Sequence, residues 1–399
     1  MAIHLIVLMC ALSHSGFGGS RVAISLYALD QGASQLTIGV LMALYAVVPL
    51  FLAVHVGRLA DRVGPRVPML IGTGGVVLGL LLPPLFPGLV TLYVSALVLG
   101  STFHFFFITV QGIAGGIGGS EHRARNFALV GMGFSAAGFI GPFLAGLAID
   151  YLGHLQAFLV LAAFPVVPLL MLLLKPGFLP KARKHAGSAG PRNAMDLWRI
   201  PGLRRTFIAS GIISSAWDLF QFYLPVYGHS VGLSASAIGA VLGVFALATF
   251  TIRVFLPALA KRYSEAQILT SGIFIAAAAF VLFPLFTNPY ILAAVAFLLG
   301  LGVGCGQPMS MSLIYALAPT GRAAECAGLR VTVNNFMHLL IPLFFGSLGA
   351  AFGYAPVFFS NSALLVAAGA IMRKARISAA PRQLEIPDPP AGEGKKNAP

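Results

Sequence analysis

The stretch GRLADRVGPR, at residues 57–66, carries four charged side chains in ten positions. Only 9% of the whole chain is charged, and long apolar runs lie on both sides of this stretch. The run that follows, VPMLIGTGGVVLGLLLPPLFPG at 67–88, has no charged residue over the roughly 20 positions that a membrane-spanning helix needs. We therefore expect residues 57–66 to form a short polar turn between two spanning helices.

Similar apolar runs recur along all 399 residues, of which 58% are hydrophobic, with a mean hydropathy of +0.90. Soluble domains contain roughly 45–50% apolar residues, so the sequence predicts an all-α membrane protein without a soluble domain. The first run lacks a basic leader and a small-residue cleavage site, so we expect it to remain as a helix. The runs predict twelve transmembrane helices, at residues 3–29, 36–56, 67–86, 89–113, 126–150, 155–174, 206–227, 235–258, 267–286, 290–317, 326–351 and 355–372.

The chain has a net charge of +14, which in a soluble protein would indicate an acidic partner such as a nucleic acid. Here 22 of the 25 Lys and Arg residues fall in alternate connections between the spans and in the C-terminal tail. This distribution is typical of the positive-inside rule. It predicts a multi-pass protein of the inner or plasma membrane with both termini cytoplasmic, the lipid bilayer as a partner, and no nucleic-acid partner.

The two halves of the chain resemble each other at a constant offset of 200 residues. Residues 26–64 align with 226–264 without a gap, and ten of the 39 pairs are identical. The same offset also pairs Gly100/Gly300, Pro142/Pro342, Gly146/Gly346, Gly153/Gly353 and Phe158/Phe358. An even number of helices in each half makes this a parallel repeat. We expect an N-terminal six-helix bundle (1–174), a basic cytoplasmic linker (175–205), a C-terminal bundle (206–377) and a disordered cytoplasmic tail (378–399).

The stretch at 57–66 resembles motif A of the major facilitator superfamily, whose pattern is G-x-L-A-D-R-x-G-x-R/K. The matching positions are Gly57, Leu59, Ala60, Asp61, Arg62, Gly64 and Arg66. The resemblance implies the fold of that superfamily, in which helices 1, 4, 7 and 10 line a central cavity between two six-helix halves. It also implies a gate, in which Asp61 meets the N-terminal dipole of helix 11 and closes the cytoplasmic side. The alternative is that the charges only anchor the turn to the anionic inner leaflet.

Two further motifs of the superfamily fit less well. Residues 136–146, AAGFIGPFLAG, match motif C loosely, at Gly141, Pro142 and Gly146. Motif B would place an arginine where this chain has Ile108. The missing arginine argues against the drug/proton antiport mechanism with which that motif is associated.

The charged side chains well inside the predicted spans are Arg21, Asp218, Arg253 and Arg330. Ionisable groups inside a membrane are costly, so each is a candidate functional residue. Arg21 is expected to bind a carboxylate through its planar guanidinium, or alternatively to snorkel to the outer surface. Asp218 is expected to carry a proton, or alternatively to pair with an arginine. Arg253 and Arg330 lie nearer the cytoplasmic side, where gating and substrate contact are both open.

Several polar residues, most of them uncharged, are further candidates or extend the set above. His14 and His104 are alternative proton carriers, or else hydrogen-bonded packing residues. Arg330, Asn334 and His338 follow one another at i, i+4 and i+8, so they form a polar stripe on one helix face. For Gln111 and Gln307, helix–helix contact is as plausible as contact with a ligand. The candidate substrate-binding residues are Arg21, Gln111, Trp217, Gln221, Gln307, Arg330 and Asn334.

These features predict a secondary transporter that gives alternating access to a site between the two halves. Three arginines against one acid favour a small organic anion as substrate, with proton coupling. One alternative is a transporter of the same fold that exports hydrophobic drugs through Phe103, Phe105, Phe106 and Phe107. Another is a transporter-derived sensor or membrane enzyme, although the chain has no HExxH or GxSxG motif, so we expect no enzyme.

The chain contains three cysteines, Cys10, Cys305 and Cys326. Their spacing fits neither a metal site nor a redox motif, so we expect no disulfide, metal or cofactor. We also expect the transporter to be a monomer.

Overall fold

The computed structural model describes residues 2–117, 123–174, 177, 179, 195–319 and 322–378. This part of the chain consists of helices and contains no strand. The helices of the first half are α1 (Ala2–Asp30), α2 (Gln35–Val63), α3 (Arg66–Leu85), α4 (Leu89–Gly116), α5 (Arg123–Leu152) and α6 (His154–Leu174). Those that follow are α7 (Met195–Trp198), α8 (Pro201–Ser230), α9 (Ala235–Ala260), α10 (Glu265–Leu282), the 3-10 helix η2 (Phe283–Leu285), α11 (Pro289–Gly304), α12 (Gly306–Leu317), α13 (Ala323–Phe352) and α14 (Tyr354–Ser378).

Ten segments within the described residues are long and apolar enough to cross a membrane. The helices α11 and α12 form one of these segments, because only Cys305 separates them. The helices α2 and α8 are equally long but do not meet the same criterion over their described parts. The all-helical membrane fold is therefore confirmed, and ten of the twelve predicted spans meet this test.

The predicted linker and tail lie largely outside the described residues. Where the linker region is described, it contains the short helix α7 and the beginning of α8. The helix α8 begins at Pro201, five residues before the predicted span, because proline is well suited to the first turn of a helix.

The turn predicted at residues 57–66 is mostly helical, so that prediction was wrong. The helix α2 continues to Val63, and only Gly64 and Pro65 separate it from α3. Gly64 ends α2 with a φ of 83°, and its N–H donates to the carbonyl oxygen of Ala60 at 3.0 Å. Leucine, alanine and arginine are good helix formers, so the charged residues extend the helix and only the glycine breaks it.

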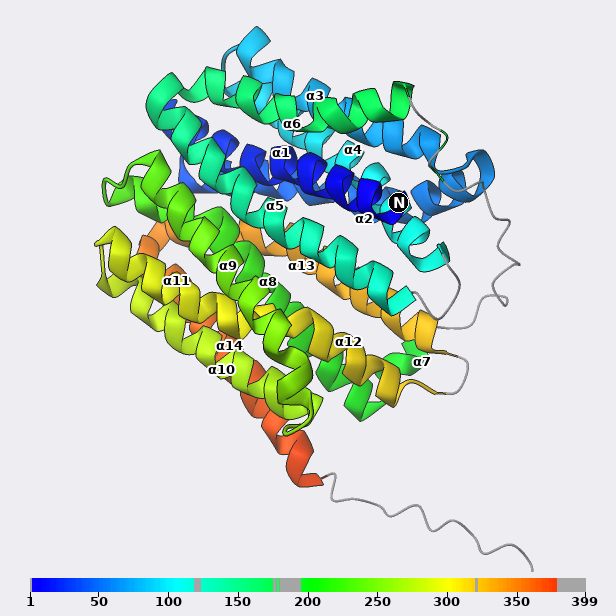
Figure 1. The fold of residues 1–399 in the computed structure, drawn as a ribbon. Helices are drawn as coiled ribbons and strands as arrows, with labels where there is room; N and C mark the ends of the chain where they lie inside the picture. The colour runs from blue at the N-terminus through cyan, green and yellow to red at the C-terminus, as the bar shows by residue number, and fades with distance from the viewer. Residues whose placement is uncertain are drawn as a thin grey trace, which may run out of the picture.

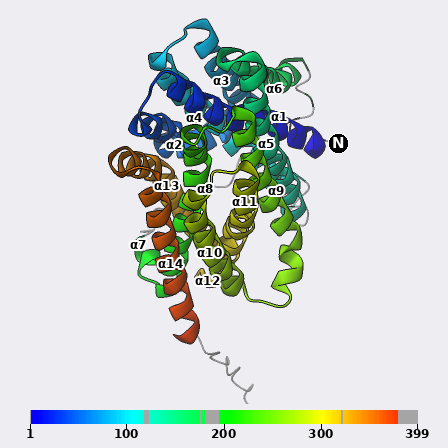
Figure 2. The ribbon, with the colours of Figure 1, turned by 90° about the vertical axis from the view of Figure 1, so that its left-hand side faces the viewer.

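Each half of the chain keeps its own helices together, and the two halves pack side by side (Figure 1). The most extensive contacts between them are made by α5 with α9 and by α2 with α13, which Figure 2 shows from the side, and α1 also contacts α8. We call the end at which α1 finishes and α2 begins, at residues 31–34, the Asp30 end. The other end, where Gly64 and Pro65 connect α2 to α3, is the Arg66 end.

At the Asp30 end the two halves approach so closely that only glycine fits. A Cβ atom at Gly39 of α2 would collide with the carbonyl oxygen of Pro342 on α13. Its repeat partner Gly239 of α9 lies in the same way against the carbonyl oxygen of Pro142 on α5. The other close approaches of this kind are Gly146 to Ala235 and Gly346 to Gln35. The offset of 200 residues therefore relates equivalent contacts, which close the Asp30 end.

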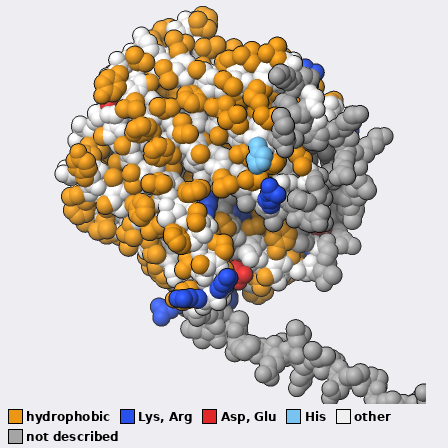
Figure 3. Space-filling model, viewed as in Figure 1, with side chains coloured by type: hydrophobic (Ala, Val, Ile, Leu, Met, Phe, Trp, Pro, Cys, Tyr) orange, Lys and Arg blue, Asp and Glu red, His pale blue; other side chains and the backbone are white. Residues whose placement is uncertain are grey.

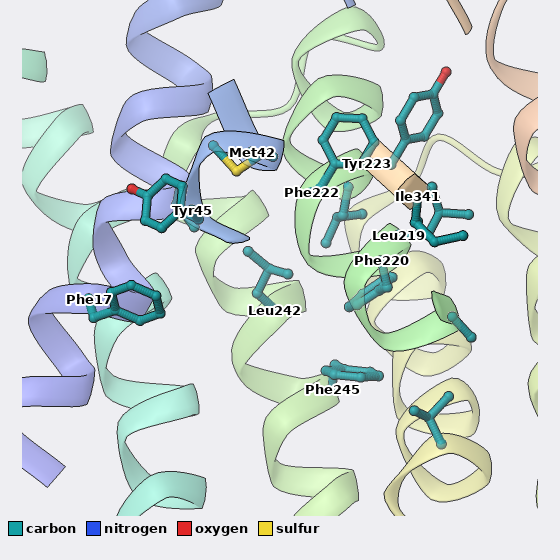
Figure 4. Packing of buried hydrophobic residues seen from close by; sticks show 14 of the residues in the cluster. Phe17, Met42, Tyr45, Leu219, Phe220, Phe222, Tyr223, Leu242, Phe245 and Ile341 are labelled. Atoms are coloured by element: carbon teal, nitrogen blue, oxygen red, sulfur yellow. The ribbon is translucent and has the colours of Figure 1, made fainter. Parts of the chain in front are cut away.

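The outer surface is largely hydrophobic, as contact with a bilayer requires (Figure 3). In the same view, a few Lys or Arg side chains lie in a recess of this apolar face. In the interior, Figure 4 shows Phe17 and Tyr45 of the first half on one side and Leu242 and Phe245 of the second half on the other. The three cysteines are all free and buried.

Candidate functional site

Asp218 of α8 is buried, with 4% of its surface exposed. Its Oδ2 atom is hydrogen-bonded to Nδ1 of His338 on α13. Its Oδ1 atom lies 3.9 Å from Nη1 of Arg21 on α1, which belongs to the other half. A ring nitrogen and a carboxylate oxygen in contact need one proton between them. The structure thus brings the predicted proton carrier and the predicted anion-binding arginine together where the halves meet.

Arg21 faces this acid instead of reaching towards the Asp30 end. Its guanidinium carbon lies 5.9 Å from the centre of the Tyr45 ring, and the Tyr45 hydroxyl is hydrogen-bonded to Ser20 at 2.8 Å. The Arg21 side chain is 19% exposed, but its Nε atom is buried and has no hydrogen-bond partner in the described part of the chain. Arg21 therefore keeps a free donor for a ligand.

The polar stripe on α13 faces the protein interior, as its spacing predicts. Arg330 is 3% exposed, and its Nε donates to the hydroxyl oxygens of Ser210 at 2.9 Å and Ser310 at 3.2 Å. Ser210 in turn donates to Oδ1 of Asn334 at 3.3 Å. The Nη2 atom of Arg330 is buried without a partner among the described residues. His338 completes the stripe, and sequence reasoning placed it there without seeing that it binds Asp218.

Arg253 of α9 connects the two halves. Its Nη1 donates to the hydroxyl of Ser135 on α5 at 3.1 Å, and its Nε to the carbonyl oxygen of Gly304 at 3.4 Å. Within the described residues, neither Arg253 nor Arg330 has an acidic partner. Arg330 is therefore a buried cation and Arg253 a partly buried one, and only neutral groups hold them in place.

The two candidate histidines have different surroundings. His104 Nδ1 is hydrogen-bonded to the carbonyl oxygen of Gly100 in its own helix at 2.8 Å, as expected of a packing residue. The His14 ring lies 5.3 Å from the Phe103 ring and 5.1 Å from the Phe134 ring, and its Nδ1 is buried without a partner in the described residues. No group of three or more metal-ligating side chains occurs in the part that the structure describes.

The remaining candidates are Trp217 and three glutamines. Trp217 precedes Asp218, and its ring packs edge-on against Phe245 at 5.0 Å. Gln111 and Gln221 are partly exposed and Gln307 is exposed. None of these three amide groups has a hydrogen bond to another described residue, so each is free to meet a ligand.

The motif A residues lie at the Arg66 end. Gly57 and Asp61 are in α2, but their side chains lie outside the described residues, so the gate at Asp61 stays a prediction. Arg62 is exposed in the last turn of α2. The Arg66 guanidinium donates to the carbonyl oxygen of Leu172 at 3.2 Å and to the next carbonyl of α6, so its contacts remain within the first half.

Asp150, which the sequence analysis did not single out, joins the halves at the Asp30 end. It lies in the last turn of α5, and its two carboxylate oxygens accept hydrogen bonds from the backbone N–H groups of Ala235 at 3.0 Å and Ser236 at 2.7 Å. These groups belong to the first turn of α9, where the helix dipole favours a negative charge. Asp150 is therefore a cap supplied by one half to a helix of the other.

Replacing Asp150 by asparagine is expected to loosen the closed Asp30 end. Loss of a charged cap costs about 1 kcal/mol, which shifts the ratio of open to closed molecules about fivefold. A cysteine introduced at Phe143, which lies against Gly239 in the closed interface, reports the change through its rate of modification by a membrane-impermeant thiol reagent. Asp30→Asn is the matched control, because Asp30 is exposed at the same end. Equal modification rates in both variants would contradict the assignment.

The family model described as Major Facilitator Superfamily matches residues 6–342. The chain belongs to this superfamily. This facilitator is 29% identical over 317 residues to the tetracycline resistance protein, class D, of Salmonella ordonez, an alignment that covers 77% of this chain and 78% of that protein. It is 26% identical over 329 residues to the class G tetracycline resistance protein of Vibrio anguillarum, an alignment that covers 78% of this chain and 80% of that protein. Members of the superfamily are transporters, so the expectations of a multi-pass membrane transporter and of no enzyme are confirmed.

Solved structures share the fold of this facilitator. A POT family transporter in complex with a thioalcohol conjugated peptide superposes with a TM-score of 0.80 at 14% identity, covering 94% of this chain and 96% of that chain. A mutant of the nucleoside transporter NupG gives a TM-score of 0.79 at 13% identity, and the superposition covers 93% of this chain and 99% of that chain. Identities this low establish the shared fold and leave the substrate open.

Proposed function

We propose that this facilitator exports small hydrophobic compounds from the cytoplasm in exchange for protons. The observation that carries the proposal is the contact of Arg21 with the Asp218–His338 pair, because it joins the two halves through groups that can gain or lose a proton. Tyr45 of the first half lies 5.9 Å from the Arg21 guanidinium carbon. Trp217 of the second half precedes Asp218 and packs on Phe245, so aromatic side chains of both halves suit a hydrophobic substrate. Since one chain supplies both sides of the site, we propose that it works as a monomer.

Export is the direction that the relatives support. The two relatives described above, of classes D and G, are named for tetracycline resistance, which is consistent with removal of a compound from the cell. Of the two substrate classes that the sequence suggests, hydrophobic compounds therefore have better support than small organic anions. Ile108 stands in place of the motif B arginine, so in this proposal the proton is carried by Asp218 and His338.

In this proposal, the charges of Arg21 and Asp218 at the interface between the two halves control alternating access. When Asp218 is ionised, it attracts Arg21 across the two halves; a proton on Asp218 removes this attraction. Proton binding and substrate binding then favour different arrangements of the halves, which exchange requires. The Arg66 end carries the basic connections, so we propose that it is cytoplasmic, together with both termini. With the Asp30 end closed, the substrate would enter from the Arg66 end.

Proton flux tests this function directly. In inverted membrane vesicles with an imposed pH gradient, acid inside, adding a transported hydrophobic compound should release protons from the lumen and lower the pH gradient. Vesicles that contain Asp218→Asn at equal abundance should not respond. A compound that accumulates without any change in the pH gradient would contradict proton exchange.

A second candidate function, transport of a small organic anion together with a proton, is favoured by Arg253 and Arg330. Arg330 is buried and Arg253 is partly buried, neither has an acidic partner in the described residues, and an anion would balance their charge. In that case protonation of Asp218 would free Arg21 for the anion, so proton and substrate would move in the same direction. The vesicle experiment separates the candidates, because the change of lumenal pH on addition of substrate then has the opposite sign.

A further inference from the structure

Four buried polar atoms of α1 lack hydrogen-bond partners in the described part of the chain: Oγ of Ser13, Nδ1 of His14, Nε of Arg21 and Oγ of Ser25. Two of them, Nδ1 of His14 and Nε of Arg21, belong to side chains that lie beside aromatic rings. Buried polar atoms are seldom left unpaired, because each one has lost its hydrogen bonds to water. The two residues are seven positions apart, close to two turns, so they lie on the same side of α1 about 10 Å apart along its axis.

An aromatic surface lies between these two atoms. Phe17, on the same face of α1, is stacked on Phe103 with ring centres 4.0 Å apart and an angle of 12° between the planes. The Tyr45 ring meets Phe17 edge-on at 5.4 Å, and His14 lies 5.3 Å from Phe103. Figure 4 shows Phe17 and Tyr45 with the apolar side chains Leu242 and Phe245 of the second half beyond them. A flat apolar molecule placed here would have one unpaired polar atom at each end.

We propose that this place, the His14–Arg21 site, binds an uncharged planar aromatic compound with a carbonyl group at one end and a hydroxyl group at the other. The proposal rests on the proposed function and specifies the class of compound that is exported. The carbonyl oxygen accepts a hydrogen bond from Nε of Arg21. The hydroxyl pairs with Nδ1 of His14 whichever tautomer the ring adopts, because a hydroxyl group both donates and accepts.

The charges at the site favour an uncharged compound. Arg21 already has a carboxylate, that of Asp218, at 3.9 Å. A substrate carboxylate would compete with Asp218 for the same guanidinium and would place two like charges close together, which disfavours ionisation of both. An aromatic cation would be repelled by Arg21. A carbonyl oxygen uses the free Nε donor and leaves the contact between Arg21 and Asp218 in place.

Four naphthalene probes test the proposal by calorimetric titration of the purified full-length protein in detergent. The first is a methyl hydroxynaphthoate with its two polar groups at opposite ends of the rings. The second, methyl naphthoate, lacks the hydroxyl; the third, naphthol, lacks the carbonyl; and the fourth is the ionised hydroxynaphthoate. We expect the first probe to bind most tightly, by about tenfold over each of the other three, which is the effect of one well-placed hydrogen bond.

Two variants assign the polar groups of the probes to their partners. Arg21→Lys keeps the charge opposite Asp218 and removes Nε. It should therefore lower the affinity for both methyl esters and leave the affinity for naphthol unchanged. His14→Phe should lower the affinity for naphthol and for the methyl hydroxynaphthoate and leave the affinity for methyl naphthoate unchanged. His104→Phe is the matched control, because its Nδ1 is already bonded to Gly100, and it should leave all four affinities unchanged.

Several results would overturn the inference. Tighter binding of the ionised hydroxynaphthoate than of its ester would show that the site selects an anion. Equal weakening of all probes by either variant, or no binding of any probe to the native protein, would show that the two atoms do not recognise these groups. If a variant proves unstable in a thermal-unfolding control, the ranking of the four probes on the native protein decides alone. Proton-coupled export of other compounds would survive such a failure, so the two proposals fail separately.

Discussion

Asp218→Asn is expected to abolish pH-driven accumulation of substrate while leaving exchange of substrate for substrate close to the native rate. The asparagine keeps the size and the hydrogen-bonding oxygen of Asp218 but cannot gain or lose a proton. Driven accumulation needs a proton to move in each cycle, whereas exchange needs only the two halves to rearrange around the substrate. The contact of Asp218 with both His338 and Arg21 makes it the group whose protonation both halves sense.

Two assays on the same liposomes separate a proton carrier from a structural ion pair. One imposes a pH gradient; the other has substrate on both sides and no gradient. Asp30→Asn is the matched control, since Asp30 is exposed at the Asp30 end, and it should behave as the native protein in both assays. Loss of both activities in Asp218→Asn would indicate a structural pair, because Arg21 would be left as an uncompensated charge. Retained accumulation would rule out Asp218 as the proton carrier.

Gly39→Ala and Gly239→Ala are each expected to reduce transport at least tenfold by keeping the Asp30 end from closing. The new Cβ atom would collide with the carbonyl oxygen of Pro342 or Pro142, and a backbone oxygen cannot move aside as a flexible side chain can. Overpacking of a close contact typically costs about 1–3 kcal/mol. A collision with a backbone atom belongs to the upper part of this range, which shifts the balance between the open and closed arrangements more than tenfold. The two variants should resemble each other, because the repeat makes their contacts equivalent.

Glycines of two other helices provide the controls for this prediction. A Cβ atom added at Gly112 of α4 or Gly131 of α5 would meet no atom within 4 Å, so Gly112→Ala and Gly131→Ala should transport normally. Exchange of labelled substrate in liposomes measures the rate, and membrane abundance is checked in parallel. Normal exchange in Gly39→Ala and Gly239→Ala would mean that the Asp30 end closes through other contacts.

The sequence predicts most of the fold because the bilayer imposes a simple rule on it. Long apolar runs must become helices in lipid, since no other partner satisfies their backbone groups. The end of α2 was mispredicted because charge marks where a helix leaves the apolar region and says nothing about where it stops. That position is set by Gly64, the residue with a φ of 83°. The break at Cys305 was also missed, since the run at 290–317 has no charged residue to mark it.

The candidate site was predicted in part, and the missing part consists of contacts between distant segments. Arg21, Asp218 and Arg330 stand out as charges in apolar runs, and the structure places each of them in the protein interior. The bond between His338 and Asp218 joins residues 120 positions apart, so spacing along one helix cannot reveal it. Asp150 did leave a signal: an acid in the last turn of a helix opposes the dipole of that helix, which indicates a partner elsewhere.

The repeat keeps the contact glycines, Gly39 with Gly239 and Gly146 with Gly346, but not this acid, because position 350, the counterpart of Asp150, is Ala350. The backbone around it is already arranged to receive a carboxylate, since Gly346 packs against Gln35 as Gly146 packs against Ala235. The speed of the transporter can therefore be tuned by engineering one surface position. Ala350→Asp would add a second cap at the start of α2, prolong the closed state and slow turnover, while the affinity for the exported compound stays the same.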